Sequence, residues 1–322
     1  MVKGYDVGGG TPRTQPLVRN MEHATQLRCI EGIAQLEPIY RFELINRLAY
    51  ERFERKYRDI VEIYHSANDN WGQTFHEMLF RVVGGTSNKL VFQELARRVT
   101  HTIVQRENNS IVSLEALLLG TAGLLDLYSE DDYIRHLKSD FEHLRTKYSI
   151  TPLSIKDWRL KNIYPHNHPT LRITQLAACL HNGTITMSSV TACRRRRDVY
   201  RLFTGRSSEY WVERFMPNAP NLDITRRMGQ FKSDLMGINF VAQIAFAYGS
   251  YTQSNRLIDN ATALLEDIPA EDNRYIKAWN SVGAIARNAY ESQAMLQLST
   301  EYCTKGRCEE CPLTPILKRH GV

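Results

Sequence analysis

The stretch Pro38–His65, PIYRFELINRLAYERFERKYRDIVEIYH, gives the clearest indication of the fold. Apolar side chains recur along it, mostly three or four residues apart, and Glu and Arg fill the positions between them. This spacing matches the period of an α-helix and places the apolar side chains on one face. The expected stripe consists of Phe42, Ile45, Leu48, Phe53, Tyr57, Ile60 and Tyr64. We therefore predict one long amphipathic helix that packs against a core.

Helical periods continue through most of the chain, and no pair of segments shows the alternation typical of a β-hairpin. Ser110 is expected to cap a helix over IVSLEALLLGTAGLLDLY, which is apolar nearly all round and should lie at the centre of the core. Further helices are expected at residues 70–83, 87–105, 132–148, 170–181, 187–203, 208–215, 230–248, 254–267, 273–282 and 290–302. The predicted fold class is all-α: a multi-helix globular bundle with long irregular loops near 149–169 and 216–229 and a cysteine-rich C-terminal knuckle.

Breaks in the helical pattern suggest how the chain is divided. Residues 1–28 contain a Gly-, Pro- and Thr-rich run without helical period, and we expect a flexible N-terminal arm there. The irregular loop at 149–169 contains three prolines, and long loops in compact domains are often functional. We expect one helical subdomain at 29–150 and a second at 151–322, with a single continuous domain over 29–322 as the alternative.

Composition indicates an ordinary globular protein, with 43% hydrophobic and 24% charged residues among 322. No apolar run approaches the roughly 18 residues of a membrane span, and no secretory signal pattern opens the chain. Outside the C-terminal tail, cysteine is sparse, which favours a reducing cytoplasm. The net charge of +6 is compatible with a nucleic-acid partner but is also common among enzymes.

Three of the six cysteines fall in the tail EYCTKGRCEECPL: Cys303, Cys308 and Cys311. Their C-x4-C-x2-C spacing suits thiolates that converge on a zinc ion or an iron–sulfur cluster, and these sites usually have four protein ligands. The alternative is a set of metal-free thiols, or a disulfide formed during purification. Candidates for the fourth ligand are Cys29, Cys193 and His320.

Five segments resemble one bacterial family, called domain of unknown function 2851. They are RFELINRLAYERFERK, NNSIVSLEALLLGTAGLL, WRLKNIYPHNHPTLRITQLAACLH, SSEYWVERF and SQAMLQLSTEYCTKGRCEEC, and the resemblance covers roughly residues 29–312. Members of that family usually carry an additional N-terminal β-containing region with nuclease-like motifs. Residues 1–20 match none of those motifs, so we expect that region to be absent here. The resemblance implies the helical part and the cysteine tail, but no function.

The tail also resembles, locally, the iron–sulfur loop of endonuclease III-type DNA glycosylases, in which a helix runs into a cysteine cluster with a C-x2-C-P-L element. Leu317 stands where that loop would have its fourth cysteine, and the first gap between cysteines is shorter here. The resemblance therefore implies a cluster-like tail without glycosylase chemistry.

Basic residues suggest where nucleic acid would bind. Four consecutive arginines make a dense positive patch, and guanidinium groups bind phosphates through bidentate hydrogen bonds. The irregular loop at 158–172 adds two more arginines. The expected contacts are Arg194, Arg195, Arg196, Arg197, Arg159 and Arg172. The alternative for the run of four is a solvated charged surface.

An enzymatic site is the second hypothesis. The loop at 158–172 holds His166 and His168, and Glu115 lies within the apolar core helix. A buried carboxylate needs a partner, and Arg172 is an expected one. By contrast, His136 and His143 lie two helical turns apart and are expected at the surface.

These features predict a nucleic-acid-associated or protein-interaction module with a structural thiolate metal or iron–sulfur site and no reaction of its own. The alternatives are a nucleic-acid-processing enzyme that uses the 158–172 loop, and a metal-free scaffold or assembly protein. The expected partners are nucleic acid or another protein chain, and no membrane.

Overall fold

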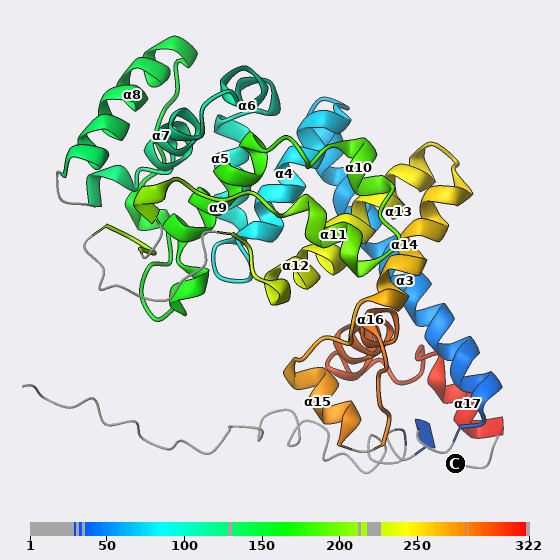
Figure 1. Ribbon diagram of the computed structural model, residues 1–322. Coiled ribbons are helices and arrows are strands. Elements are labelled where there is room, and N and C mark those ends of the chain that lie inside the picture. Colours follow the sequence, from blue (N-terminus) through cyan, green and yellow to red (C-terminus); the bar gives the residue numbers. More distant parts are fainter. Residues whose placement is uncertain are drawn as a thin grey trace, which may run out of the picture. The chain divides into compact units, whose positions relative to one another are not determined.

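The computed structural model describes residues 29, 32–33, 36–127, 131–211, 214–217, 227–281 and 283–319. Within these ranges the chain is helical, and its β-structure is limited to an isolated bridge between Pro269 and Asn288 (Figure 1). The α-helices are α3 (Pro38–Ser66), α4 (Trp71–Val83), α5 (Lys89–Arg98), α6 (His101–Glu107), α7 (Ile111–Thr121), α8 (Asp132–Tyr148), α9 (Pro169–His181), α10 (Met187–Thr191), α11 (Arg196–Leu202), α12 (Gln230–Met236), α13 (Ala242–Tyr251), α14 (Asn255–Asp267), α15 (Arg274–Asn280), α16 (Ala289–Gln297) and α17 (Leu313–Arg319). The predicted all-α class is confirmed.

Shorter elements join these helices. Four are 3-10 turns: η1 (Leu125–Leu127), η2 (Ile155–Asp157), η3 (Pro165–Asn167) and η4 (Glu209–Trp211). Two are π-helices, η5 (Gly237–Val241) and η6 (Leu298–Cys303), and each continues an α-helix without a break. No helix in the described part of the chain is long and apolar enough to cross a membrane.

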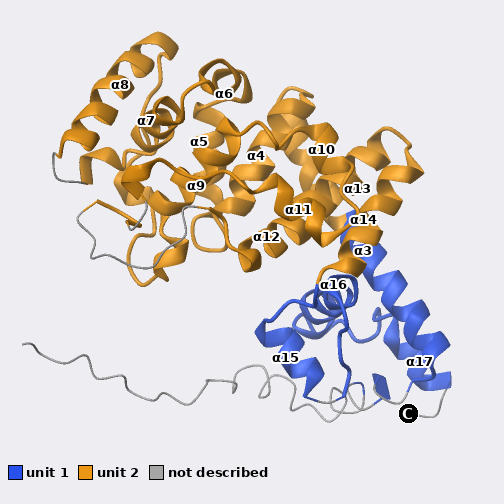
Figure 2. Cartoon of the chain, in the orientation of Figure 1, with its two compact units in different colours: residues 1–54, 269–322 blue, residues 55–268 orange. Residues whose placement is uncertain are grey.

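Contacts divide the chain into two compact units, which Figure 2 shows in different colours. Unit 1 comprises residues 1–54 and 269–322, and unit 2 comprises residues 55–268. This division differs from the expected boundary near residue 150. The reason is that α7 packs both on α8, which precedes that boundary, and on α9, which follows it. The expected arm at 1–28 lies outside the described residues.

Helix α3 follows the expected apolar stripe, with one exception. Ile45, Leu48 and Ile60 are buried, but Phe42 is 64% exposed. In the first turns the buried face is centred on Leu44 and Leu48, and Phe42 lies about 200° around the helix from Leu44. Placing Phe42 in the stripe was therefore wrong.

Helix α7 lies at the centre of unit 2, as its all-round apolar sequence predicts. Every residue from Leu114 to Thr121 is buried, and Ser110 caps the helix by accepting the N–H of Ser113 at 3.2 Å. Gly120 allows α8 to approach closely, because a Cβ there would lie 2.1 Å from Cγ of Phe141. The absence of a side chain at Gly120 thus positions α8 on the core.

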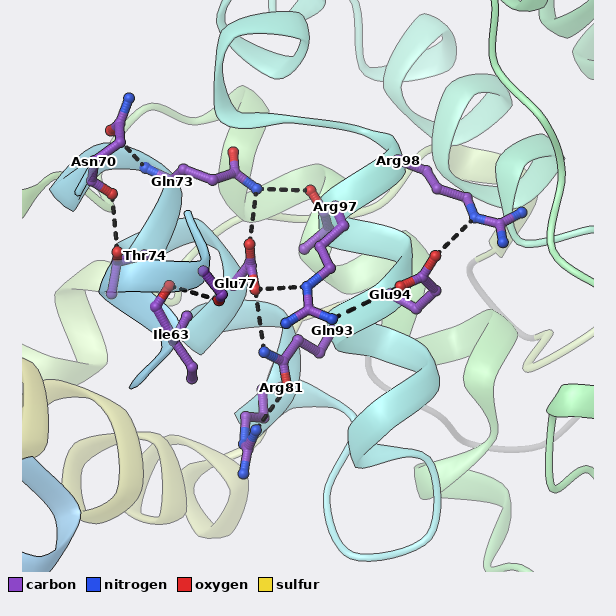
Figure 3. A network of polar contacts seen from close by, with 12 residues as sticks. Ile63, Asn70, Gln73, Thr74, Glu77, Arg81, Gln93, Glu94, Arg97 and Arg98 are labelled. Atoms are coloured by element: carbon purple, nitrogen blue, oxygen red, sulfur yellow. Dashed lines mark hydrogen bonds and ion pairs between the residues drawn. The ribbon is translucent and has the colours of Figure 1, made fainter. Parts of the chain in front are cut away.

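A polar network joins α4 to α5 (Figure 3). The side chain of Glu77 is only 3% exposed and accepts hydrogen bonds from Gln73, Gln93 and Arg97 at 3.3, 3.1 and 3.0 Å. Arg81 in turn donates to Gln93. Each donor reaches the carboxylate from one of the two packed helices. These hydrogen bonds satisfy the buried Glu77 carboxylate, so its burial is explained by a structural role.

Four of the expected helices are interrupted or shortened. The one that begins at Ile111 ends as α7 at Thr121, and the turn η1 follows it. The helix at 87–105 breaks at Val99–Thr100, where the buried His76 ring bonds the Val99 carbonyl at 2.7 Å. Burial lowers the pKa of His76 to about 3, so the ring is neutral. The helix at 187–203 breaks between α10 and α11, and the one at 208–215 is only the turn η4.

Unit 1 packs around the N-terminal half of α3. Leu44 and Leu48 meet Trp279, Met295 and Leu313 in one hydrophobic cluster. The Trp279 indole donates to the Ser299 hydroxyl at 2.6 Å, which fixes α15 against η6. The cysteine tail follows η6 and rejoins this cluster through Cys311 and Leu313.

Candidate functional site

The three tail cysteines stand on two successive tight turns. Cys303 is the last residue of η6, and Gly306, with a φ of +66°, turns the chain so that its N–H reaches the Cys303 carbonyl at 3.2 Å. Cys311 then donates its N–H to the Cys308 carbonyl at 3.3 Å. The Thr314 hydroxyl donates to the same carbonyl at 2.6 Å, just inside α17. A π-turn inside a helix is rare and is frequent at functional sites.

Cys29 lies with the tail cysteines, although it comes from the opposite end of the described chain. Each of the four thiols interacts electrostatically with the other three. Cys29 and Cys303 also pack against the hydrophobic cluster that contains Cys311. Burial raises the pKa of Cys303 to about 12 and raises the pKa of Cys29 and Cys311 as well. The thiols are free rather than paired as disulfides.

Cys311 is surrounded by hydrogen-bond donors. The backbone N–H groups of Leu313 and Thr314 lie near its sulfur and lower the pKa of Cys311, against the effect of burial. Donors of this kind tune thiolates that hold metals. As the side chains stand, however, no group of three or more His, Cys, Asp or Glu residues in the described ranges is arranged to hold a metal ion. The four thiols are therefore near one another without forming a finished coordination shell.

The other two candidates for a fourth ligand differ from Cys29. His320 lies outside the described residues. Cys193 belongs to unit 2, where its thiol donates to the Ser189 carbonyl at 3.3 Å and burial raises its pKa to about 12. Cys29 is thus the candidate that the structure places in unit 1 near the tail cysteines.

Glu115 is the carboxylate at the centre of unit 2, and four hydrogen bonds satisfy it. It accepts from the backbone N–H of Ser208 at 3.0 Å, the Ser208 hydroxyl at 2.9 Å, the Trp211 indole at 2.9 Å and the Tyr133 hydroxyl. Burial raises its pKa, and the four donors act in the opposite direction. The expected partner Arg172 was wrong, because Arg172 bonds Gln175 and Asn167 instead.

The run of four arginines has mixed roles. Arg196 forms a bidentate ion pair with Asp234, with both N–O distances at 2.7 Å, and stacks on Tyr200. The backbone N–H groups of Arg194 and Arg195 bond the Asp198 carboxylate and so start α11. Three side chains remain exposed and without an ion-pair partner in the described part of the chain: Arg194, Arg195 and Arg197.

The 158–172 loop is held by structural contacts. The buried Trp158 indole donates to the Ala122 carbonyl at 2.8 Å, and the backbone of Arg159 exchanges two hydrogen bonds with the Asn88 amide. His168 caps α9 by accepting the Thr170 N–H, and burial lowers the pKa of His168 to about 4. His166, in contrast, is exposed. The Arg159 side chain is also exposed, whereas Arg172 is buried.

Sequence reasoning missed Lys232, which is buried in α12. A signal for it exists: Lys232 lies four residues after Met228 and four before Met236, and both methionines are buried. Helical periodicity alone therefore places this lysine on the apolar face of its helix. His136 and His143 are exposed on α8, as predicted.

Comparison with known proteins places the chain in a family. One family model, described as "Protein of unknown function (DUF2851)", matches residues 12–274. The chain belongs to this family. The predicted resemblance is thereby confirmed, and the matched range includes Cys29, Glu115 and the arginines, while the tail cysteines follow it. No curated protein and no solved structure matches the chain. Function in this DUF2851 member must therefore be inferred from its own residues.

Proposed function

We propose that Cys29, Cys303, Cys308 and Cys311 bind one structural metal centre, a zinc ion or an iron–sulfur cluster, and that the protein is an interaction module rather than an enzyme. The observation that carries the proposal is that Cys29, like Cys303, packs against the hydrophobic cluster that contains Cys311, within electrostatic range of all three tail thiols. Four thiolates are the usual ligand set of both kinds of centre.

Several local features support this assignment. The turns at Cys303 and Cys308–Cys311 have the tight backbone typical of metal knuckles, and N–H donors already surround Cys311. Binding requires the four sulfurs to move from mutual proximity into a tetrahedral arrangement. Cys29, Cys303 and Cys308 are half-buried, and rotation about their Cα–Cβ bonds would let their sulfurs approach the buried Cys311 without unfolding the turns. A bound metal would also deprotonate its thiol ligands, against the effect of burial, which raises the pKa of Cys29, Cys303 and Cys311.

A metal centre here would act as a clasp within unit 1. It would join the segment around Cys29 to the tail, two parts of the chain that are distant in sequence. Structural zinc sites contribute about 10–16 kcal/mol of binding free energy, much of which is folding free energy. We therefore expect metal removal to loosen the segment around Cys29 and the turns at the tail.

The test begins with the full chain purified under reducing conditions. Elemental analysis should find about one zinc ion per chain, or iron with a broad visible absorption near 400 nm from thiolate–iron charge transfer. Cys29→Ser should lower the metal content well below that of the wild type. Cys193→Ser is the matched control, because serine can keep the bond to the Ser189 carbonyl and the residue lies in unit 2.

Two results would overturn the proposal. One is a reduced chain that holds neither zinc nor iron and gives no thiolate–cobalt charge-transfer band on titration with cobalt(II). The other is a Cys29→Ser variant that keeps the full metal content. The first result would favour the metal-free scaffold, in which the cysteines pack as small apolar residues.

A second candidate function concerns nucleic acid. Arg194, Arg195 and Arg197 are exposed at the start of α11, within four residues of one another, and this is the observation that favours it. Binding through phosphate contacts would weaken steeply as salt increases. Replacing these three arginines with glutamine should reduce the salt slope by about 3, whereas Arg145→Gln on α8 should leave it unchanged. Absence of binding even at low salt would exclude this partner class.

The enzymatic alternative has less support. Trp158 and His168 in the 158–172 loop are engaged in structural hydrogen bonds, and Glu115 is saturated with donors. A catalytic carboxylate normally keeps an open position for the substrate or a water molecule.

A further inference from the structure

Unit 2 buries two basic side chains that have no carboxylate partner in the described part of the chain. Arg172 and Lys232 are each only 7% exposed. Arg172 lies in the first turn of α9, and Lys232 lies in the first turn of α12. Burial and, after it, the neighbouring Arg172 charge lower the pKa of Lys232 well below its usual value, so an anion beside Lys232 would favour its charged form. Buried charges are normally paired with an opposite charge, so this pair requires an explanation.

Neutral acceptors satisfy only part of the hydrogen-bonding capacity of Arg172. Its Nη1 donates to the Gln175 side chain at 2.9 Å, and its Nη2 donates to Asn167 at 3.1 Å. Its Nε is buried and has no hydrogen-bond partner. A guanidinium has five N–H donors in a planar fork, so Nε–H and further N–H groups lack an acceptor.

Lys232 is also partly satisfied. Its ammonium donates to the carbonyls of Val82 and Val83 at 2.9 and 3.0 Å. These carbonyls lie at the C-terminal end of α4, which carries partial negative charge. An ammonium has three N–H donors, so one remains. The end of α4 thus holds Lys232 in place, but it provides no full counter-charge.

The position of Arg172 near the start of its helix adds to the imbalance. The N-terminal end of a helix carries partial positive charge and favours anions over cations. Arg172 is the fourth residue of α9, so the helix backbone supplies it with no negative partial charge. Burial lowers the pKa of Arg172 to about 10, which still leaves it charged at neutral pH. The guanidinium is therefore a buried charge without a full counter-charge in the described part of the chain.

We propose that Arg172 and Lys232 form the core of a binding site for a small oxyanion, a phosphate or a carboxylate group. The oxyanion would accept from Nε of Arg172 and from the remaining N–H of Lys232, while Asn167 and Gln175 hold the guanidinium plane in position. This site is separate from the proposed metal centre, because its residues all belong to unit 2.

The test uses thermal unfolding of the full chain at constant ionic strength. Inorganic phosphate or acetate replaces chloride stepwise, and a ligand that binds the native state raises the Tm with its concentration. A rise with phosphate alone assigns a phosphate group, a rise with acetate alone assigns a carboxylate, and a rise with both assigns an unselective oxyanion site. No rise with either anion above that in chloride would overturn the proposal.

Variants locate the effect. Arg172→Met removes the charge at similar volume and should abolish the anion-dependent rise. Arg159→Met, at the exposed arginine of the preceding loop, should retain it. An undiminished rise in Arg172→Met would mean that the anion binds elsewhere, and this would overturn the proposal. Should Arg172→Met not fold, Arg172→Lys keeps the charge but lacks Nε, and its anion affinity should be at least about tenfold lower. Unchanged affinity in that variant would overturn the proposal equally.

Discussion

Replacing Glu115 with leucine tests whether this carboxylate is a structural hub. The substitution keeps an apolar side chain of similar length in α7 but removes the acceptor of four hydrogen bonds. Two of the donors, the backbone N–H of Ser208 and the indole of Trp211, cannot become acceptors. The other two are hydroxyls that can still pair with each other, because the Tyr133 and Ser208 oxygens lie 2.8 Å apart.

The expected magnitude follows from the two stranded donors. Each buried donor without a partner costs about 1–3 kcal/mol, which gives a gross loss of about 2–6 kcal/mol. Removing the carboxylate also removes the cost of burying it, a cost that its raised pKa reflects. We therefore expect Glu115→Leu to reduce the free energy of unfolding by about 2–4 kcal/mol.

Equilibrium unfolding in urea, followed by tryptophan fluorescence, measures this change through the midpoint at constant m value. Glu142→Leu is the matched control: Glu142 is 65% exposed on α8 and pairs with Arg145 alone at 3.4 Å. The control should change stability by no more than about 0.5 kcal/mol. Trp211→Phe, which removes the indole donor, should cost about 1 kcal/mol less in the Glu115→Leu background than in the wild type.

The reasoning would be refuted by a Glu115→Leu variant as stable as the wild type, or more stable. That outcome is expected of a functional carboxyl group held at a cost to stability, and it would revive the enzymatic alternative. Absence of coupling between Glu115 and Trp211 would likewise show that the hydrogen bond contributes nothing to stability.

Three further predictions concern unit 2. Because burial raises the pKa of Glu115, its stabilising contribution is complete below the ordinary pKa of a glutamate and is lost as pH rises through the raised value. The wild type should therefore lose stability relative to Glu115→Gln as pH rises above the ordinary glutamate pKa of about 4, measured by urea unfolding. Gly120→Ala should destabilise the protein by about 1–3 kcal/mol despite better helix propensity, because the new Cβ would lie 2.1 Å from Cγ of Phe141. Adding Phe141→Ala should recover part of this loss of stability, as measured by calorimetry. Arg97→Met should cost about 1–3 kcal/mol by leaving the buried Glu77 without its cation, and an unchanged Tm would contradict this.

Much of the helical framework could be predicted from local sequence. The period of α3, the all-round apolar run of α7 and the cap at Ser110 were read correctly, because each depends on residues within a few turns of one another. Errors arose where a distant residue intervened. His76 on α4 bonds the Val99 carbonyl and accompanies the break between α5 and α6, which no local pattern signals.

The candidate sites show the same distinction. The tail spacing identified Cys303, Cys308 and Cys311 as a set, whereas only the fold shows that Cys29 lies near them in unit 1. The sequence also marked Glu115 as a buried carboxylate that needs partners, whereas its actual donors come from α8 and from the segment around η4.

The sequence by itself determined the helical class, the centre of the core and the presence of a thiol-rich tail, because periodicity, capping and spacing are local properties. Tertiary structure decided which distant residues meet: Cys29 with the tail, Glu115 with Trp211, and Arg172 with Lys232. Such meetings depend on how helices pack across the chain, and the free energy of that packing is shared among many side chains rather than encoded in any one segment.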